Sequence, residues 1–251
     1  MKNFILICIS VALFISCGIC RKFTSDDKSS KKENTKTEKS ESVTEEGKSK
    51  TEEKKSNAGT EVSMLEFDKS NLPSEINYTG SIVTGKRWTD KNGENILILT
   101  KTKVKEKKVK QYGTEDNILE CELFGYQYVS TGGSYTLLWK INDLVKDCMF
   151  DLTLDFIPGS LSITDLNDNG IAESTFLYKM CCRSDVSPAE LKLMMHENDS
   201  KYALRGNMLV KVEGYTGGGD YKVDKSFANA PDEFLDYAKS QWKEYRVETF
   251  K

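Results

Sequence analysis

The sequence has few of the residues from which many catalytic sites are built. It contains one histidine, His196, and four prolines in 251 residues. A single histidine excludes most Ser-His-Asp arrangements and metal sites that need several imidazole ligands. Strand-like segments follow one another without alternating helices, which excludes a doubly wound nucleotide-binding fold. The sequence therefore favours a non-catalytic protein, while enzymatic activity stays open.

Neither sign of charge dominates, and a long stretch near the N-terminus almost lacks apolar residues. The net charge is −3 and the isoelectric point is about 5.5, which does not indicate a nucleic-acid partner. In residues 21–60, eleven basic and nine acidic residues interleave, and only Phe23, Val43 and Ala58 are apolar. Such a segment cannot bury enough apolar surface to offset its ordering entropy. We therefore predict a disordered tether over residues 17–60.

Long hydrophobic runs are absent except at the N-terminus. Lys2 precedes an apolar run over residues 4–15, which is shorter than the ~20 residues of a spanning helix and is typical of a secretory signal. The stretch Phe14-Ile15-Ser16-Cys17 resembles a lipobox. We predict a signal peptide over residues 1–16 and lipidation of Cys17, with an ordinary secretory signal as the alternative. The protein would then be lipid-anchored in the cell envelope, at the outer membrane, facing the periplasm or the surface.

The cysteines beyond the predicted tether indicate a disulfide. Cys181 and Cys182 are adjacent, so on a strand they point to opposite faces, and only one of them easily reaches a given partner. We expect a bond between Cys148 and Cys182, with Cys121 and Cys181 buried or paired with each other, although spacing alone does not fix the pairing. A zinc site is the rival interpretation, disfavoured because His196 lies far along the chain. We expect His196 on the surface of a strand.

The remaining residues, 61–251, read as a single β-rich domain. We expect a mainly β fold of about 9–11 antiparallel strands with one C-terminal amphipathic helix. Asn92-Gly93, Gly132-Gly133 and Asn198-Asp199 are turn signals between strand-like runs. The helix should follow Pro231, with one apolar face formed by Phe234, Ala238, Trp242 and Tyr245.

Six lysines lie between Lys101 and Lys110. They could form an anion-binding patch. Alternatively, they protect an edge strand against pairing with another sheet, which is a common use of lysine at sheet edges. We favour the second interpretation.

The stretch DLNDNGIAE, residues 165–173, has the residue order of a short calcium loop. Calcium prefers six to eight oxygen ligands. The predicted ligands are the side chains of Asp165, Asn167, Asn169 and Glu173 and the carbonyl of Ile171. Two of these are amides, so we expect weak binding, on the order of 10⁻⁴ to 10⁻³ M. The alternative is a polar turn in which Asp165 and Asn167 accept hydrogen bonds from their own backbone.

Four aromatic residues, Trp88, Tyr126, Tyr128 and Trp139, are candidates for glycan contact if they line an exposed concave face. The alternative is that all four pack in the core, as most large aromatic residues do.

Several segments together resemble a known family. These are GKRWTDKNGENILIL, ITDLNDNGIAESTFLYKMCCRSDVSP, LKLMMHENDSKYALRG and the late glycine-rich stretch before a tryptophan-bearing helix. They resemble a family of Bacteroidota lipoproteins labelled surface polysaccharide biosynthesis protein, over roughly residues 76–246. The acidic loop is also similar to the calcium loops of FG-GAP repeats. Members of the lipoprotein family often carry more aspartate in this loop than this chain, which has asparagine at positions 167 and 169. This difference agrees with weak calcium binding here.

The resemblance implies a role in making or displaying lipopolysaccharide or capsule. We therefore expect a membrane-anchored envelope lipoprotein that supports surface polysaccharide assembly by non-catalytic binding. Its expected partners are the membrane, through the lipid on Cys17, and a surface glycan or envelope proteins. The alternatives are a lysozyme inhibitor-like protein and a glycan-processing envelope protein.

Overall fold

The computed structural model describes residues 61–111 and 114–250, and all structural statements below concern this part of the chain. The predicted signal peptide, Cys17 and the predicted tether lie outside it. The described residues form fifteen strands, one short 3₁₀ helix (η1, Lys225–Asn229) and one α-helix (α1, Asp232–Tyr245). The predicted fold class, mainly antiparallel β with one C-terminal helix, is confirmed. The strand number exceeds the expected 9–11 because several strands have only two to four residues.

The first sheet is antiparallel and has the order β1-β2-β3-β5-β4, with β6 on the other side of β5. Its strands are β1 (Ser63–Leu65), β2 (Ser81–Asp90), β3 (Gly93–Lys101), β4 (Lys105–Gln111), β5 (Thr114–Thr131) and β6 (Ser134–Cys148). β5 is long enough to pair with β4 near its start and with β3 near its end, while β6 runs along its other edge.

The second sheet is also antiparallel and has the order β14-β11-β10-β9-β7, with β8 pairing β9 as well. Its strands are β7 (Asp151–Phe156), β8 (Ser162–Thr164), β9 (Glu173–Arg183), β10 (Glu190–Glu197), β11 (Ser200–Asn207) and β14 (Tyr221–Val223). A small third sheet contains β12 (Leu209–Val212), β13 (Tyr215–Gly218) and β15 (Val247–Glu248), of which β12 and β15 are parallel.

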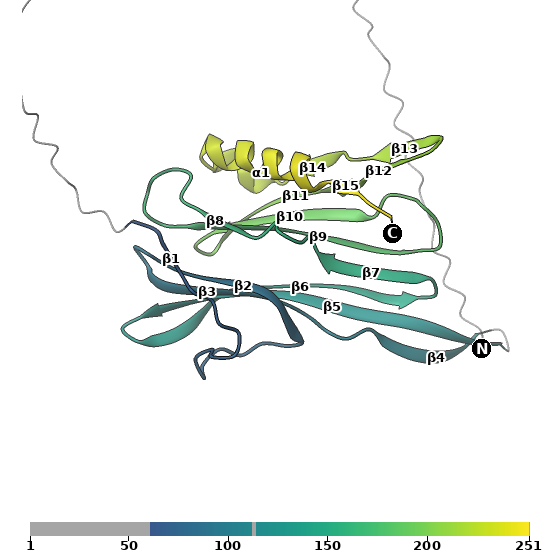
Figure 1. Cartoon of the computed structure of the whole chain (residues 1–251), viewed down its shortest axis with the longest axis horizontal. Coiled ribbons are helices and arrows are strands. Elements are labelled where there is room, and N and C mark those ends of the chain that lie inside the picture. Colours follow the sequence, from purple (N-terminus) through teal and green to yellow (C-terminus); the bar gives the residue numbers. More distant parts are fainter. Residues whose placement is uncertain (1–60, 112–113, 251) are drawn as a thin grey trace, which may run out of the picture. The chain divides into compact units, whose positions relative to one another are not determined.

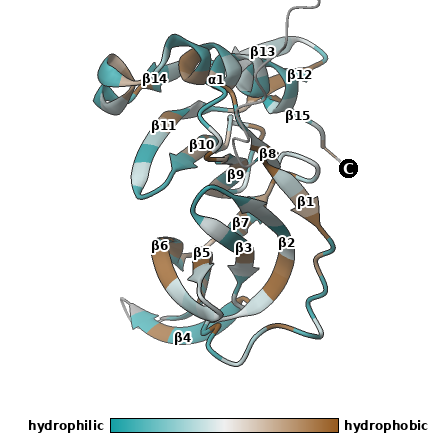
Figure 2. Cartoon of the chain, turned by 90° about the vertical axis from the view of Figure 1, so that its left-hand side faces the viewer, coloured by the Kyte–Doolittle hydropathy of each residue, from teal (hydrophilic) through white to brown (hydrophobic). Residues whose placement is uncertain are grey.

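The two large sheets pack face to face, and α1 covers the outer face of the second sheet (Figures 1 and 2). The core between the sheets joins Trp88 and Leu97 of the first sheet to Phe156 and Phe176 of the second. A second core forms between the helix and β9, β10 and β11. Residues 66–80 cover the outer face of the first sheet and form a third cluster there.

The predicted turns and helix are present. β2 and β3 turn at Lys91-Asn92, β5 and β6 at Gly132-Gly133, and β10 and β11 at Asn198-Asp199. Both glycines of the second turn have positive φ, 76° and 95°, which suits a tight hairpin. In α1, the buried residues are Phe234, Ala238 and Trp242, which share one face.

The lysine-rich segment forms β4, which is an edge strand of the first sheet. Lys107 lies 2.5 Å from Glu120 of β5, and Lys110 lies 3.7 Å from Glu115. The position of β4 therefore agrees with lysines that protect a sheet edge. Within the described residues, no helix is both long and apolar enough to cross a membrane.

Candidate functional site: the loop between β8 and β9

Four of the five predicted calcium ligands lie in the loop that connects β8 to β9, and the fifth, Glu173, is the first residue of β9. Asp165 closes this loop through its carboxylate. Its Oδ1 accepts a hydrogen bond from the amide of Asn169 at 3.0 Å, and its Oδ2 accepts one from the amide of Gly170 at 2.9 Å. Gly170 has a φ of 77°, a conformation that glycine adopts without strain. The loop is thus folded by its own first residue.

Asn167 and Asn169 each bond in two directions. Asn167 Oδ1 accepts from the amide of Asn169 at 3.2 Å, and Asn169 Oδ1 accepts from the amide of Ile171 at 2.7 Å. The side-chain nitrogens of both asparagines donate to Glu197 Oε1, at 3.2 and 2.6 Å. These bonds include those that the polar-turn interpretation predicts, in which Asp165 and Asn167 accept from backbone amides of the loop.

Glu173 lies beneath the loop and is completely buried, with 0% of its surface exposed. Its Oε2 accepts hydrogen bonds from the Leu166 amide at 2.9 Å and from the Thr164 hydroxyl at 3.1 Å. Its Oε1 is buried and has no hydrogen-bond donor among the described residues. The pKa of Glu173 is raised to about 7, mainly by burial and to a smaller extent by the charge of Glu197, although the hydrogen bonds from Leu166 and Thr164 act to lower it.

Two neighbouring turns contribute residues that the sequence did not connect with this loop. The amide of Lys91 donates to the carbonyl of Gly170 at 2.9 Å, and its ammonium group donates to the carbonyl of Asn169. Asn92 Nδ2 donates to Asn198 Oδ1 at 2.5 Å and so joins the β2–β3 turn to the β10–β11 turn. No local pattern indicates these contacts, because they join residues 78 and 106 positions apart.

The loop contains oxygen atoms of the kind that a hard cation prefers as ligands. A carboxylate oxygen that accepts one hydrogen bond keeps a second lone pair, so both oxygens of Asp165 can still coordinate an ion. Oε1 of Glu173, which has no hydrogen-bond partner among the described residues, is a further candidate ligand. No three His, Cys, Asp or Glu side chains of the described residues are arranged to hold a metal ion. A calcium ion would therefore depend on amide and backbone oxygens as well, as the sequence predicts.

The four aromatic candidates for glycan contact are buried, so the core-packing alternative describes them. Trp88, Tyr126, Tyr128 and Trp139 are 0%, 4%, 5% and 8% exposed. The polar atom of each ring is bonded inside the protein: Trp88 Nε1 to Asp90, Trp139 Nε1 to Gln127, and the hydroxyls of Tyr126 and Tyr128 to the backbone of Thr79 and Asn77. Burial removes all four rings from contact with a ligand at the surface.

His196 is also buried, and the prediction of a surface position is wrong. Its ring stacks on Trp139 with 3.9 Å between the ring centroids, in the core between the two sheets. Side chains alternate between the two faces along β10. Met195 and Glu197 point to the face that carries the helix, so His196 points into the core between the sheets. Burial lowers the pKa of His196 to about 3, and the charge of Lys201 acts in the same direction. The imidazole is therefore neutral at physiological pH.

The predicted disulfide is present. Cys148, at the end of β6, is bonded to Cys182 of β9, with 5.6 Å between the Cα atoms. The bond joins the two large sheets. Cys121 is buried, Cys181 is partly exposed, and both are free thiols, so they do not pair with each other.

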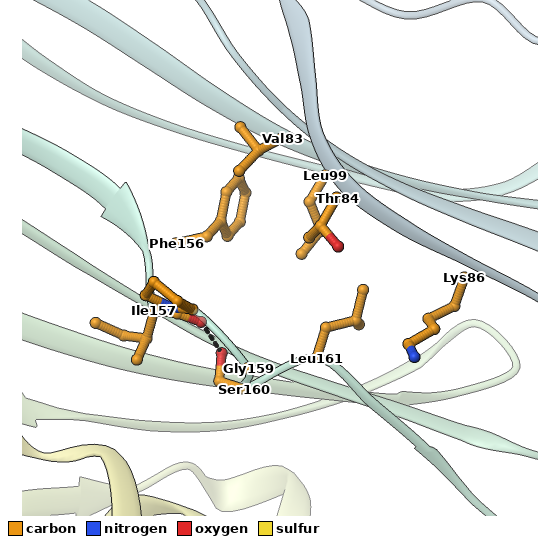
Figure 3. Close-up of a pocket in the computed structure, with 10 residues that line it drawn as sticks. Val83, Thr84, Lys86, Leu99, Phe156, Ile157, Gly159, Ser160 and Leu161 are labelled. Atoms are coloured by element: carbon orange, nitrogen blue, oxygen red, sulfur yellow. Dashed lines mark hydrogen bonds between the residues drawn. The ribbon is translucent and has the colours of Figure 1, made fainter. Parts of the chain in front are cut away.

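A groove of about 410 Å³ opens between the two large sheets on the side of β2 (Figure 3). Val83 and Leu99 of the first sheet face Phe156 of β7 and Leu161 of the connection between β7 and β8, and Lys86 lies at one end. The groove exists because β7 ends at Phe156 and β8 begins only at Ser162, so residues 157–161 form an open connection. The hydroxyl of Ser160 holds this connection by donating to the carbonyl of Ile157 at 2.7 Å. Its lining offers mainly apolar contact and no cluster of ionisable groups.

Comparison with known proteins found no relative of this chain. No protein-family model matches the chain, and neither the curated proteins nor the solved structures contain a match.

Proposed function

We propose that this chain is a lipid-anchored protein of the bacterial cell envelope that supports assembly of surface polysaccharide by binding, without catalysing a reaction. In this proposal, calcium stabilises the loop over residues 165–173. The lipid on Cys17 holds the protein at the membrane, and the β-rich part of the chain contacts a glycan or a protein of the assembly machinery.

Export is supported by the disulfide between Cys148 and Cys182, because disulfides persist in the periplasm and at cell surfaces and are rare in the cytosol. The signal-like N-terminus and the lipobox-like stretch before Cys17 point to the same compartment. The resemblance to envelope lipoproteins labelled for surface polysaccharide biosynthesis supports the cellular role.

The calcium part of the proposal depends on one observation, the buried and unpartnered Oε1 of Glu173. A buried polar atom without a partner destabilises a fold by roughly 1–3 kcal/mol. A bound cation would remove that cost, and Asp165, Asn167 and Asn169 supply further oxygens within the same loop. The ion's role is to fix the loop and the two turns that touch it.

Deletion and complementation in the source bacterium test the proposed role. Cells that lack the chain should display less surface polysaccharide, and the wild-type gene should restore it. A Cys17→Ala variant should fail to restore it, because the protein is no longer held at the membrane. A Cys20→Ala variant removes the next cysteine in the sequence but keeps Cys17. It is the matched control and should restore the polysaccharide fully. Unchanged polysaccharide in the deletion strain would contradict the proposed role.

The same strains distinguish the alternatives. A lysozyme inhibitor should leave the polysaccharide unchanged and make wild-type cells more resistant to lysozyme than the deletion strain. A glycan-processing enzyme should change the length or composition of the glycan, and the purified protein should release a product from it. The proposal predicts a reduced amount of glycan of unchanged composition and no released product.

A further inference from the structure

A second groove, of about 330 Å³, lies on the opposite side of the sandwich from the apolar groove, between β6 and the strands β9, β10 and β11. Its floor contains Ile141, Tyr178 and Met194. Its charged side chains are Asp143 of β6, Lys192 of β10, and Lys201 and Arg205 of β11. Lys140 also lines it, but its ammonium group lies over the rings of Phe124 and Tyr126, which belong to the cluster on the outer face of the first sheet.

A row of like charges crosses the second sheet at this groove. Lys192 of β10 lies directly opposite Arg205 of β11, and Arg205 lies directly opposite Lys222 of β14. Like charges at directly opposed positions weaken strand pairing. The repulsion among these three cations is offset either by carboxylates of the protein or by an anionic ligand.

Two of these cations are compensated within the protein. Asp143 lies 2.5 Å from the ammonium group of Lys192 and also accepts a hydrogen bond from the Tyr178 hydroxyl at 2.9 Å. Asp224 lies 2.7 Å from the guanidinium group of Arg205.

Lys201 and Lys222 differ from these two. Both are exposed, and neither has a carboxylate within 4.0 Å among residues 61–111 and 114–250. Lys201 lines the groove, and Lys222 lies opposite Arg205 on the neighbouring strand, so both leave uncompensated positive charge on this surface.

A neighbouring groove of about 400 Å³ shares Lys192 and Arg205 as lining residues and also contains Lys222. It adds two carboxylates, those of Glu190 and Asp220, of which Glu190 lies 3.9 Å from the ammonium group of Lys192. The combined surface therefore offers uncompensated cations beside carboxylates and an apolar floor. Cations bind acid groups, carboxylates accept hydrogen bonds from hydroxyl groups, and the floor packs against C–H groups.

We propose that this surface, lined by Lys192, Lys201, Arg205 and Lys222, binds an acidic saccharide, that is, a glycan bearing carboxylate groups. The choice of a saccharide rests on the proposed function, whereas the negative charge of the ligand is inferred from Lys201 and Lys222, which have no carboxylate within 4.0 Å among the described residues. A nucleic acid fits less well, because single-stranded nucleic acids need exposed aromatic rings for stacking. Tyr178, the aromatic side chain that lines this groove, is buried and lies under the ammonium group of Lys192.

Calorimetric titration of the purified full-length protein tests the inference. The probes are a galacturonic acid tetramer and a galactose tetramer of the same linkage, which differ only in their carboxylate groups. The acidic tetramer should bind at low salt and lose affinity at high salt, and the neutral tetramer should bind at least tenfold more weakly. Equal affinities for the two tetramers would overturn the inference.

Charge-removing substitutions locate the site. Lys201→Gln combined with Lys222→Gln should weaken binding of the acidic tetramer roughly tenfold, because both lysines lack a partner in the fold. Lys69→Gln combined with Lys211→Gln removes two exposed lysines elsewhere and should leave the affinity unchanged. Both double variants should keep the wild-type melting temperature. Equal losses in the two double variants would show a net-charge effect and would contradict a site at the groove.

Two further probes separate other polyanions from the proposed ligand. A glutamate peptide and a single-stranded DNA of similar charge should bind more weakly than the acidic tetramer. Tighter binding of either would overturn the saccharide assignment. The test is independent of the cellular experiment. Loss of polysaccharide in the deletion strain without tetramer binding would reject this inference alone, whereas tetramer binding without that loss would reject the proposed role alone.

Discussion

Glu173 and Glu197 lie directly opposite each other on β9 and β10, on the same face of the second sheet. Two carboxylates at such positions repel each other. The structure compensates one of them with the side-chain amides of Asn167 and Asn169, which donate to Glu197. Burial raises the pKa of the other carboxylate, Glu173. The loop over residues 165–173 is thus attached to β10 by the same glutamate that faces Glu173.

Replacing Glu197 should loosen the loop. Glu197→Ala removes the acceptor of two side-chain hydrogen bonds, so we expect a loss of about 1–2 kcal/mol in the free energy of unfolding. Faster amide exchange at residues 165–171 should accompany it. Asp199 is an exposed carboxylate in the turn that follows Glu197. Asp199→Ala is therefore the control and should change neither quantity. Both quantities can be measured by urea denaturation and hydrogen exchange. Unchanged exchange in Glu197→Ala would contradict the attachment.

His196 should make the protein sensitive to acid. Its pKa is about 3 in the folded protein because it is buried, against about 6.5 in an unfolded chain. Between these values the unfolded chain binds the proton and the folded protein does not, so stability falls as pH drops through this range. The contribution approaches about 1.4 kcal/mol per pH unit. Urea denaturation at several pH values should show this slope.

The variant His196→Gln isolates this contribution, because other groups also titrate in acid. The difference in unfolding free energy between wild type and variant should be largest at pH 7.5 and should shrink as the pH falls. At neutral pH the variant loses the stacking of His196 on Trp139 and should be less stable by about 1 kcal/mol. A difference that is constant with pH would mean that His196 titrates normally in the folded protein.

The disulfide should contribute strongly to stability. Cys148 and Cys182 are 34 positions apart, and closing a loop of this length restricts the unfolded chain by about 3–4 kcal/mol. Replacing both cysteines by serine should therefore lower the melting temperature, and a reducing agent should lower that of the wild type by a similar amount. Cys181→Ser removes a free thiol and should keep the sensitivity to the reducing agent. A wild type that is insensitive to reduction would show that the bond is not formed in solution.

Local sequence chemistry accounts for the features that could be predicted. The hairpin turns at Gly132-Gly133 and Asn198-Asp199 depend on residues that tolerate positive φ. The helix depends on the spacing of Phe234, Ala238 and Trp242. The alternation of side chains along β9 explains why only one of the two adjacent cysteines, Cys182, is bonded to Cys148.

Features that depend on long-range packing could not be predicted in this way. The burial of His196 is decided by which face of β10 meets the first sheet, and no residue near it in the sequence carries that information. The same holds for Lys91 of the β2–β3 turn and Glu197 of β10, which contact the loop from distant parts of the chain. Trp88 and Trp139 lie in the core because the two sheets pack face to face, and the sequence near these residues does not specify that packing.

Calcium binding to the loop is tested most directly by thermal unfolding of the purified protein with a chelator, with magnesium and with calcium. At a calcium concentration about ten times the dissociation constant, a single site stabilises the folded protein by about 1.4 kcal/mol. For a folded unit of this size, that corresponds to a rise in melting temperature of about 3–5 °C. We predict this rise for the wild type with calcium, a smaller one with magnesium, and none for Asp165→Ala or Glu173→Gln. An unchanged melting temperature of the wild type at millimolar calcium would contradict the calcium site and leave the loop as a polar turn.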